Sequence, residues 1–302
     1  HGKRRETGWR GRKTLLWIIA ILITITAAVY QRLIGPTRPV RGSVEVSGEL
    51  VRYRFERTAS NDREHTVRLE LPPALLEREV HIEGQLHLRR YPTDDPWTTK
   101  PLVREGDALV ATLPTQPSGG KIAYHLEVRD RAHPEDGSVV FPAGESAIVL
   151  RYRGPVPSWL VLTHVLFIFT AMVWSNRAGL EGLVRGGDPR RHTTVALLLL
   201  FVGGMIFGPL MQWYAFGAFW TGFPLGYDLT DNKTLIAVIA WLLAFFLGRS
   251  AVERARVWAV VAALVTLIIF SIPHSVLGTE LDYSEMDASS WPASSETTPG
   301  KP

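Results

Sequence analysis

Two histidines lie within apolar stretches of this sequence, and they are the side chains best suited to chemistry. His164 lies in the run 155–176 and His274 in the run 257–279, and neither run contains Asp, Glu, Lys or Arg. An ionisable side chain at membrane depth is commonly functional, because an apolar environment makes it costly to keep there. Neutral imidazole is also a common ligand of metal ions and of haem iron. Each histidine could instead be an interfacial residue bonded to a backbone carbonyl, and both interpretations stay open.

The segment from Gln212 to Thr234 combines aromatic residues with glycine, alanine and acidic side chains. Its aromatic residues are Trp213, Tyr214, Phe216, Phe219, Trp220, Phe223 and Tyr227. The small residues between them would let the backbone approach a flat hydrophobic ligand closely. The aromatic residues could instead form an interfacial belt, with Asp231 as a helix N-cap and Asp228 exposed in the turn.

The chain contains no cysteine, which excludes several kinds of site. Without thiolates it can form no disulfide, iron–sulfur cluster, cysteine-ligated zinc site or cysteine nucleophile. Covalent attachment of haem through a Cys-x-x-Cys-His motif is excluded for the same reason. Any haem would therefore be held by side-chain ligation alone.

Five apolar stretches predict membrane-spanning helices, since a helix needs about 20 residues to cross the hydrocarbon core. They cover residues 14–34, 158–176, 193–214, 230–248 and 257–277. The predicted fold class is an α-helical polytopic membrane protein with five transmembrane helices and an extracytoplasmic all-β sandwich inserted between the first two. The predicted parts are a basic cytoplasmic N-terminus (1–13), the first helix (14–34), the β-sandwich (36–157), a four-helix transmembrane domain (158–277) and a disordered acidic tail (278–302).

The distribution of basic residues predicts the orientation of these helices. Lysine and arginine cluster before the first span, between the second and third, and between the fourth and fifth. Short loops rich in basic residues remain on the cytoplasmic side. We therefore expect a protein of the cytoplasmic (inner) membrane, with its N-terminus inside and its β domain and C-terminus outside. The basic charge is explained by topology, so we expect no nucleic acid partner.

Between residues 36 and 157 the apolar residues alternate with polar ones, which is typical of β-strands. Strand-like runs cover residues 43–56, 65–71, 81–89, 108–113, 123–129 and 145–153. Short strands separated by turn residues predict an antiparallel sandwich, and their spacing resembles that of immunoglobulin-like or fibronectin-like modules. We interpret His81, His87 and His125 as solvent-facing strand residues. His81 and His87 would lie about 20 Å apart along one strand, too far to share a metal ion.

The aromatic segment and the two membrane histidines together resemble the haem-handling membrane proteins of cytochrome c assembly. Those proteins carry a tryptophan-rich outer loop that ends in an acidic residue and is flanked by two histidines. Here 215–220 (Ala-Phe-Gly-Ala-Phe-Trp) followed by Asp228 is similar to that loop, and His164 and His274 occupy the flanking places. Phe216 replaces the first tryptophan of the family pattern, and the sandwich is foreign to it.

The resemblance implies a b-type haem near the outer face, with His164 and His274 as axial ligands. The loop residues that would pack on the porphyrin or bind it are Trp213, Phe219, Trp220 and Asp228. Two imidazoles suit low-spin iron, which would serve electron transfer or haem handling rather than oxygen chemistry.

Two other function classes remain possible, and the sequence does not decide whether the chain is an enzyme. The first is a non-catalytic accessory or scaffold subunit of an envelope membrane complex, which would dock other membrane or extracytoplasmic subunits through the sandwich. The second is a transporter, which is disfavoured because no inverted repeat and no charged residue deep within a helix is evident. On every reading the lipid bilayer is a partner.

Overall fold

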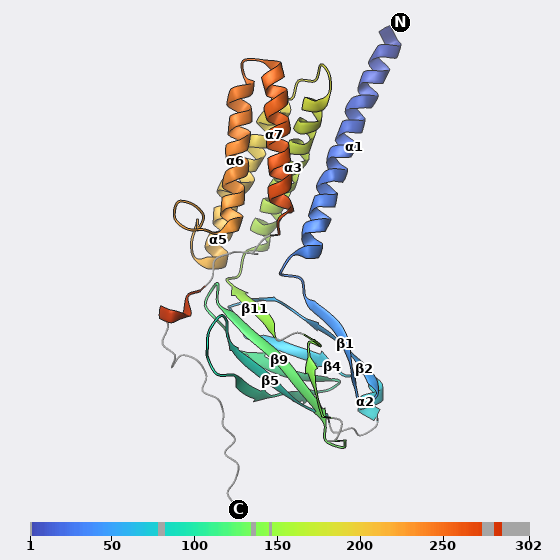
Figure 1. The fold of residues 1–302 in the computed structure, drawn as a ribbon, viewed down its shortest axis with the longest axis vertical. Helices are drawn as coiled ribbons and strands as arrows, with labels where there is room; N and C mark the ends of the chain where they lie inside the picture. The colour runs from blue at the N-terminus through green and yellow to red at the C-terminus, as the bar shows by residue number, and fades with distance from the viewer. Residues whose placement is uncertain (1, 78–81, 134–136, 145–146, 274–280, 286–302) are drawn as a thin grey trace, which may run out of the picture. The chain divides into compact units, whose positions relative to one another are not determined.

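The computed structural model describes residues 2–77, 82–133, 137–144, 147–273 and 281–285. The chain divides into two compact units (Figure 1). The helical unit is formed by His1–Pro36 and Val156–Thr279, and the β unit by Thr37–Pro155 and Glu280–Pro302. Each unit therefore contains segments that are distant in sequence.

The helical unit consists of long apolar helices. They are α1 (Gly2–Ile34), α3 (Ser158–Leu183), α4 (Arg190–Leu200), the π-helix η2 (Phe201–Phe207), α5 (Gly208–Phe216), α6 (Leu229–Gly248) and α7 (Val252–Ser271). Five segments are long and apolar enough to cross a membrane: Gly11–Ile34, Ser158–Leu183, Arg190–Phe216, Leu229–Gly248 and Val252–Ser271. The sequence-based prediction of five such helices is thus confirmed at the level of length and composition.

Several helix ends differ from the sequence-based prediction: α1 begins at Gly2 rather than at 14, and α7 begins at Val252 rather than at 257. α3 continues beyond residue 176 to Leu183, because Arg177 forms an ion pair with Glu181 one turn further on. α7 ends at Ser271 rather than at 277. Pro273 explains this end, since a residue before proline is disfavoured in the α conformation and Ile272 is extended, with φ −73° and ψ 125°.

A proline, Pro209, also explains the π-helix in the third span. Pro209 has no N–H to donate to the carbonyl four residues earlier, and its ring would clash with that carbonyl. The helix widens locally, so the N–H of Gly208 donates to the carbonyl of Gly203, five residues back. Gly203 also packs closely on α3, because a Cβ there would lie 2.9 Å from the Cβ of Phe167.

The helices of this unit are joined by small residues and by a few buried polar contacts. Gly179 of α3 faces the Cβ of Ala263 on α7, which lets these two helices approach closely. Asn176 Nδ2 donates to Thr24 Oγ1 of α1 at 3.0 Å, and Trp241 Nε1 donates to Thr266 Oγ1 at 2.9 Å. Such hydrogen bonds hold membrane helices together where lipid offers no competing partner.

The β unit contains three sheets. Its strands are β1 (Val40–Val46), β2 (Glu49–Phe55), β3 (Thr58–Ser60), β4 (His65–Glu70), β5 (Ile82–Arg90), β6 (Thr98–Pro101), β7 (Val103–Glu105), β8 (Ala108–Leu113), β9 (Lys121–Asp130), β10 (Ser138–Phe141) and β11 (Ile148–Arg153), with the short helix α2 (Pro73–Glu77). The sheets are the hairpin β1–β2, the order β3-β11-β9-β5-β6 with β10 on β9, and the order β4-β8-β7. All described pairs are antiparallel except β11 with β3.

The predicted run 43–56 is two strands rather than one. Ser47 and Gly48 form a two-residue turn with positive φ at both positions, 50° and 79°, so β1 and β2 form a hairpin. The alternation predicted for β5 and β9 is confirmed. Their buried residues include Leu86 and Leu88 on β5 and Tyr124, Leu126 and Val128 on β9.

The histidines of the β unit are less dispersed than predicted. His87 and His125 lie opposite each other on β5 and β9, and their rings stack with centroids 4.7 Å apart. Both are only partly exposed. Both lie on the more exposed face of the sheet, as predicted, but pairing between neighbouring strands brings them together, and spacing along one strand does not reveal such pairing. His81 lies outside the described residues.

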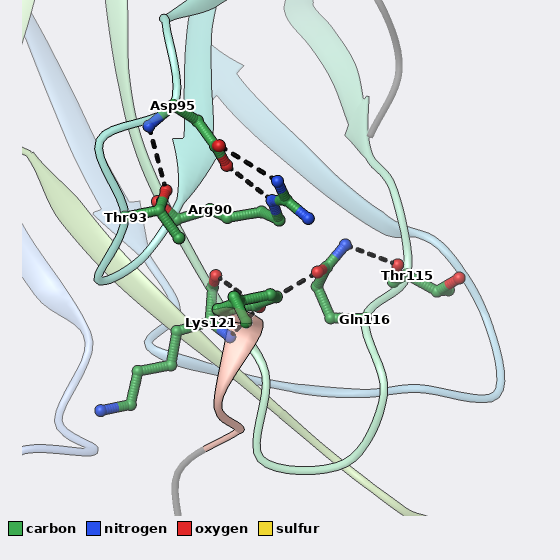
Figure 2. Close-up of polar contacts among 7 residues, drawn as sticks. Arg90, Thr93, Asp95, Thr115, Gln116 and Lys121 are labelled. Carbon is green, nitrogen blue, oxygen red and sulfur yellow. Dashed lines mark hydrogen bonds and ion pairs between the residues drawn. The ribbon is translucent and has the colours of Figure 1, made fainter. Parts of the chain in front are cut away.

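The described part of the predicted disordered tail, Leu281–Glu285, docks on the β unit. Tyr283 is only 7% exposed. Its hydroxyl oxygen accepts a hydrogen bond from the backbone N–H of Lys121 at 2.8 Å and lies 3.0 Å from Gln116 Oε1. Figure 2 shows Gln116 and Lys121 beside the Arg90–Asp95 ion pair, whose shorter contact is 2.6 Å. The Arg90 guanidinium lies 5.4 Å from the centroid of the Tyr283 ring. Hydrogen bonds from Arg90 hold the pKa of the Asp95 carboxyl below its usual value.

Candidate functional site

His164 is held by a hydrogen bond between two helices. It lies in the second turn of α3, and its Nδ1 is 2.9 Å from the carbonyl oxygen of Gly203 in η2. Because a carbonyl only accepts, this contact requires the proton on Nδ1. Nε2 then carries a lone pair, and it has no hydrogen-bond partner among the residues that the structure describes. This is the tautomer that a metal-ligating histidine adopts when its other nitrogen donates to a backbone carbonyl.

The π-helix supplies the geometry of this contact. The carbonyl of Gly203 accepts both the backbone N–H of Gly208 and the imidazole of His164. A Cβ at Gly208 would lie 3.9 Å from Cε1 of the His164 ring, so the ring packs against this junction. The site thus depends on a proline-induced distortion of one helix and on the close approach of another. π-helical segments of this kind are frequent at functional sites.

His274, the second predicted ligand, lies outside the described residues, but the residues before it are well fixed. Lys233 of α6 donates from Nζ to the carbonyls of Ile272 (2.9 Å) and Pro273 (3.2 Å). Gln31 of α1 donates to the Ile272 carbonyl as well, at 3.3 Å. Three helices therefore meet at the end of α7. The distance between the two histidines stays a prediction.

Lys233 is a residue that sequence reasoning missed. It lies within the predicted span 230–248, and in the structure it belongs to α6 and is only 2% exposed. A signal was available, because Pro273 predicts an early end of the last helix, and the carbonyls left free there need a donor. Lys233 is the fifth residue of α6, close to its beginning, so it does not contradict the prediction that no charged residue lies deep within a helix.

The two acidic residues of the loop have structural roles that differ from those predicted. Asp228 is buried and is itself the N-cap of α6, since its carboxylate accepts from the N–H groups of Thr230 (2.8 Å) and Asp231 (3.4 Å). Asp231 accepts from the N–H of Thr221 at 2.7 Å and from its hydroxyl at 3.2 Å. Both carboxylates thus fix the loop to α6. A direct contact between Asp228 and a ligand stays a prediction.

The predicted aromatic residues are arranged in two ways. Trp213 of α5 and Phe219 of the loop stack on each other with centroids 4.6 Å apart and 12° between planes, and both remain about half exposed. Trp220 donates from Nε1 to the carbonyl of Phe223 at 3.1 Å. The first pair forms a flat aromatic surface suited to an apolar ligand. The second contact closes the loop on itself.

The opposite end of the helical unit contains a second group of buried polar residues. Arg177 is 1% exposed, forms an ion pair with Glu181 at 2.6 Å and lies over the ring of Trp17 at 5.6 Å. His192 packs between Trp17 and Trp174, with centroids 6.0 and 5.6 Å from theirs. Sequence reasoning placed Arg177 in an inner loop. Its position in the structure instead joins α1 to α3.

The β unit presents an outward face on β5 and β9, with one pocket beside it and a second pocket lined by residues of β2, β4 and α2. On this face Trp97 contacts the edge of His125 at 4.9 Å, and Arg89 covers the Trp97 ring at 4.8 Å. Burial and the neighbouring His87 lower the pKa of His125. One pocket of about 290 Å³ is lined by Glu83, Gln85, Leu102, Glu127, Arg129 and Arg131, and another of about 440 Å³ by Leu50, Arg52, Glu70, Leu76 and Asp107.

No known protein family, curated protein or solved structure matches this chain. Within the described part of the chain, no group of three or more His, Asp or Glu side chains is placed to hold a metal ion. Functional inference therefore depends on the geometry around His164. There the His164 imidazole is a donor of the kind that ligates haem iron, and haem needs only one or two protein ligands.

Proposed function

We propose that this chain is an integral membrane protein that binds a b-type haem near the outer end of its helical unit. His164 would be one axial ligand and His274 the other. The observation that carries the proposal is the hydrogen bond from His164 Nδ1 to Gly203, which orients the ring and leaves Nε2 as the ligating atom. Bound haem would supply one-electron chemistry, serving electron transfer or haem handling.

The chain's own residues would bind, orient and shield the group. Lys233 would hold the segment that leads into His274, through the carbonyls directly before it. The stacked rings of Trp213 and Phe219 offer an apolar contact surface, and Asp228 keeps their loop attached to α6. In this proposal the buried charges of Lys233 and Asp228 serve to position the haem site.

We further propose an orientation in the cytoplasmic membrane with the N-terminus inside and the β unit and C-terminus outside. The clusters of basic residues support it. The hydrogen bonds of Tyr283 with Lys121 and Gln116 support it too, because a segment that contacts the β unit would share its compartment. The segment between these two parts contains four of the span-length helices, an even number, as this arrangement requires.

A second candidate is a scaffold subunit of an envelope complex, which would bind other membrane or extracytoplasmic subunits. The outward face of β5 and β9 favours it, because Trp97 and the stacked histidines form a partly exposed aromatic surface beside a pocket. Tryptophan and arginine are common at the centres of protein interfaces. The two functions are compatible in one chain.

An absorption spectrum of the purified protein from haem-replete cells separates these candidates. We expect a Soret band with sharp α and β bands on reduction. His164→Ala should abolish or convert the low-spin spectrum, and so should His274→Ala. His192→Ala is the matched control, because His192 packs between two tryptophans at the other end of the unit and should leave the spectrum unchanged. A colourless protein would leave only the scaffold function.

A further inference from the structure

The loop between α5 and α6 exposes large apolar side chains at its tip. Phe223 is 64% exposed, Leu225 78% and Tyr227 93%. They alternate with Pro224 and Gly226, which have little or no side chain to cover them. In Figure 1 this loop extends sideways from the end of the helical unit. The three side chains therefore face the surroundings of the unit rather than its interior.

Four backbone N–H groups of this loop donate to acceptors within the loop or on α6. The N–H groups of Leu225 and Gly226 donate to the carbonyl of Gly222, both at 2.9 Å. The N–H of Phe223 donates to Asn232 Oδ1 at 2.7 Å, and that of Asp228 donates to the carbonyl of Thr221 at 3.0 Å. Pro224 has no N–H. These four N–H groups therefore do not need water, which lowers the cost of placing the loop in the interfacial region, where water and headgroups can bond to the remaining backbone groups.

The exposed surface of the loop also lacks charge. No Asp, Glu, Lys or Arg occurs from Gly208 to Tyr227. The carboxylates that follow, Asp228 and Asp231, are buried and bonded to the backbone. The loop follows directly on α5, the last part of the span Arg190–Phe216, where Tyr214 is 44% exposed. The loop is thus continuous with a helix surface that lipid would cover.

We propose that residues 222–227 form a wedge that inserts into the interfacial region of the lipid bilayer. Phe223 and Leu225 reach the acyl-chain boundary, and Tyr227 lies at headgroup level, where its ring and hydroxyl suit the two environments. The occupant is lipid, because the loop continues the membrane-facing surface and has no charge to recognise a polar partner. Attachment is independent of lipid charge for the same reason. The wedge fixes the depth of the α5–α6 connection whether or not haem is bound.

Site-specific fluorescence in nanodiscs tests this proposal. The chain has no cysteine, so Leu225→Cys can be labelled at one position with an environment-sensitive dye such as NBD. Nanodiscs of phosphatidylcholine with and without brominated acyl chains then report contact with lipid. Ile268→Cys is the membrane control, because Ile268 is 65% exposed on α7, and Asp62→Cys in an exposed turn of the β unit is the aqueous control.

We expect blue-shifted emission at position 225 and quenching by brominated lipid close to that at position 268, with none at position 62. Replacing part of the phosphatidylcholine with an anionic lipid should not change this quenching. Water-like, unquenched emission at position 225 would overturn the proposal. So would blue-shifted emission without bromine quenching, since that result means contact with protein. Circular dichroism of each labelled variant confirms that the helices are intact.

Discussion

The two ends of the helical unit both bury charged side chains, but they satisfy those charges differently. Near His164, Lys233 and Asp231 bond to backbone atoms of other segments: the carbonyls of Ile272 and Pro273, and the N–H of Thr221. At the opposite end, Arg177 pairs with Glu181 on its own helix. Its guanidinium then lies over an aromatic ring of α1.

This difference indicates two purposes for buried charge in one bundle. Bonds to backbone atoms fix the course of non-helical segments, which is what a binding site requires. An ion pair within one helix, covered by tryptophan, joins two helices without positioning any loop. We therefore expect changes at the Arg177 end to alter stability alone, and changes at the Lys233 end to alter both stability and the site.

The largest expected effect is that of Glu181→Gln. It leaves the Arg177 guanidinium buried without its counter-charge, and the loss of one partner of a buried pair costs about 3–5 kcal/mol. Thermal unfolding in detergent, followed by circular dichroism, measures this loss. Glu253→Gln, at an exposed position of α7, is the control and should change little. Loss of the haem spectrum in folded Glu181→Gln protein would contradict the expectation that changes at the Arg177 end alter stability alone.

A smaller loss of stability is expected for Lys233→Met, but with a spectral change. The carbonyl of Pro273 loses its described donor, whereas that of Ile272 retains Gln31, and the loss of a hydrogen bond from a charged group costs about 1.5–3 kcal/mol. Because these carbonyls directly precede His274, the low-spin spectrum should weaken or shift. Arg185→Met, at an exposed position after α3, should change neither property. If stability falls and the spectrum of the folded protein is unchanged, Lys233 has only a structural role.

A weaker effect is expected for Asn176→Ala, which tests how α1 is attached. This change removes the hydrogen bond to Thr24, and such bonds between membrane helices average about 0.6 kcal/mol. The melting temperature should therefore fall slightly, with the spectrum intact. A loss as large as that of Glu181→Gln would show that the hydrogen bond, rather than the Arg177 contact, is the main attachment of α1.

The smallest expected effect is a pH dependence of stability that arises from His125 in the β unit. Its pKa is lowered by burial and by His87, so protonation favours the unfolded state, and stability should fall as the pH drops below about 6.5. The carboxyl of Asp95 stays charged in this range, because its pKa is lowered. The melting temperature of the β unit should decrease between about pH 7.5 and about pH 5.5, and less so in His125→Gln. An equal decrease in both proteins would assign the pH dependence to other groups.

The features that the sequence determined by itself are local ones. Hydrophobic length predicted five span-length helices, and alternation predicted β8 at residues 108–113 as observed. Both patterns depend on solvent preference repeated along a short segment, so no knowledge of neighbours is needed. The sequence also directed attention to His164 and to the aromatic loop.

The features that only the tertiary structure decided are pairings between residues distant in the chain. Lys233 meets Pro273, His164 meets Gly203, and His87 stacks on His125. Each pairing depends on which helices or strands are neighbours in the fold. Composition and local sequence patterns do not specify those neighbours. The physical reason is that a buried polar group must find a partner wherever the fold places one, so its role is defined by contact and not by its position in sequence.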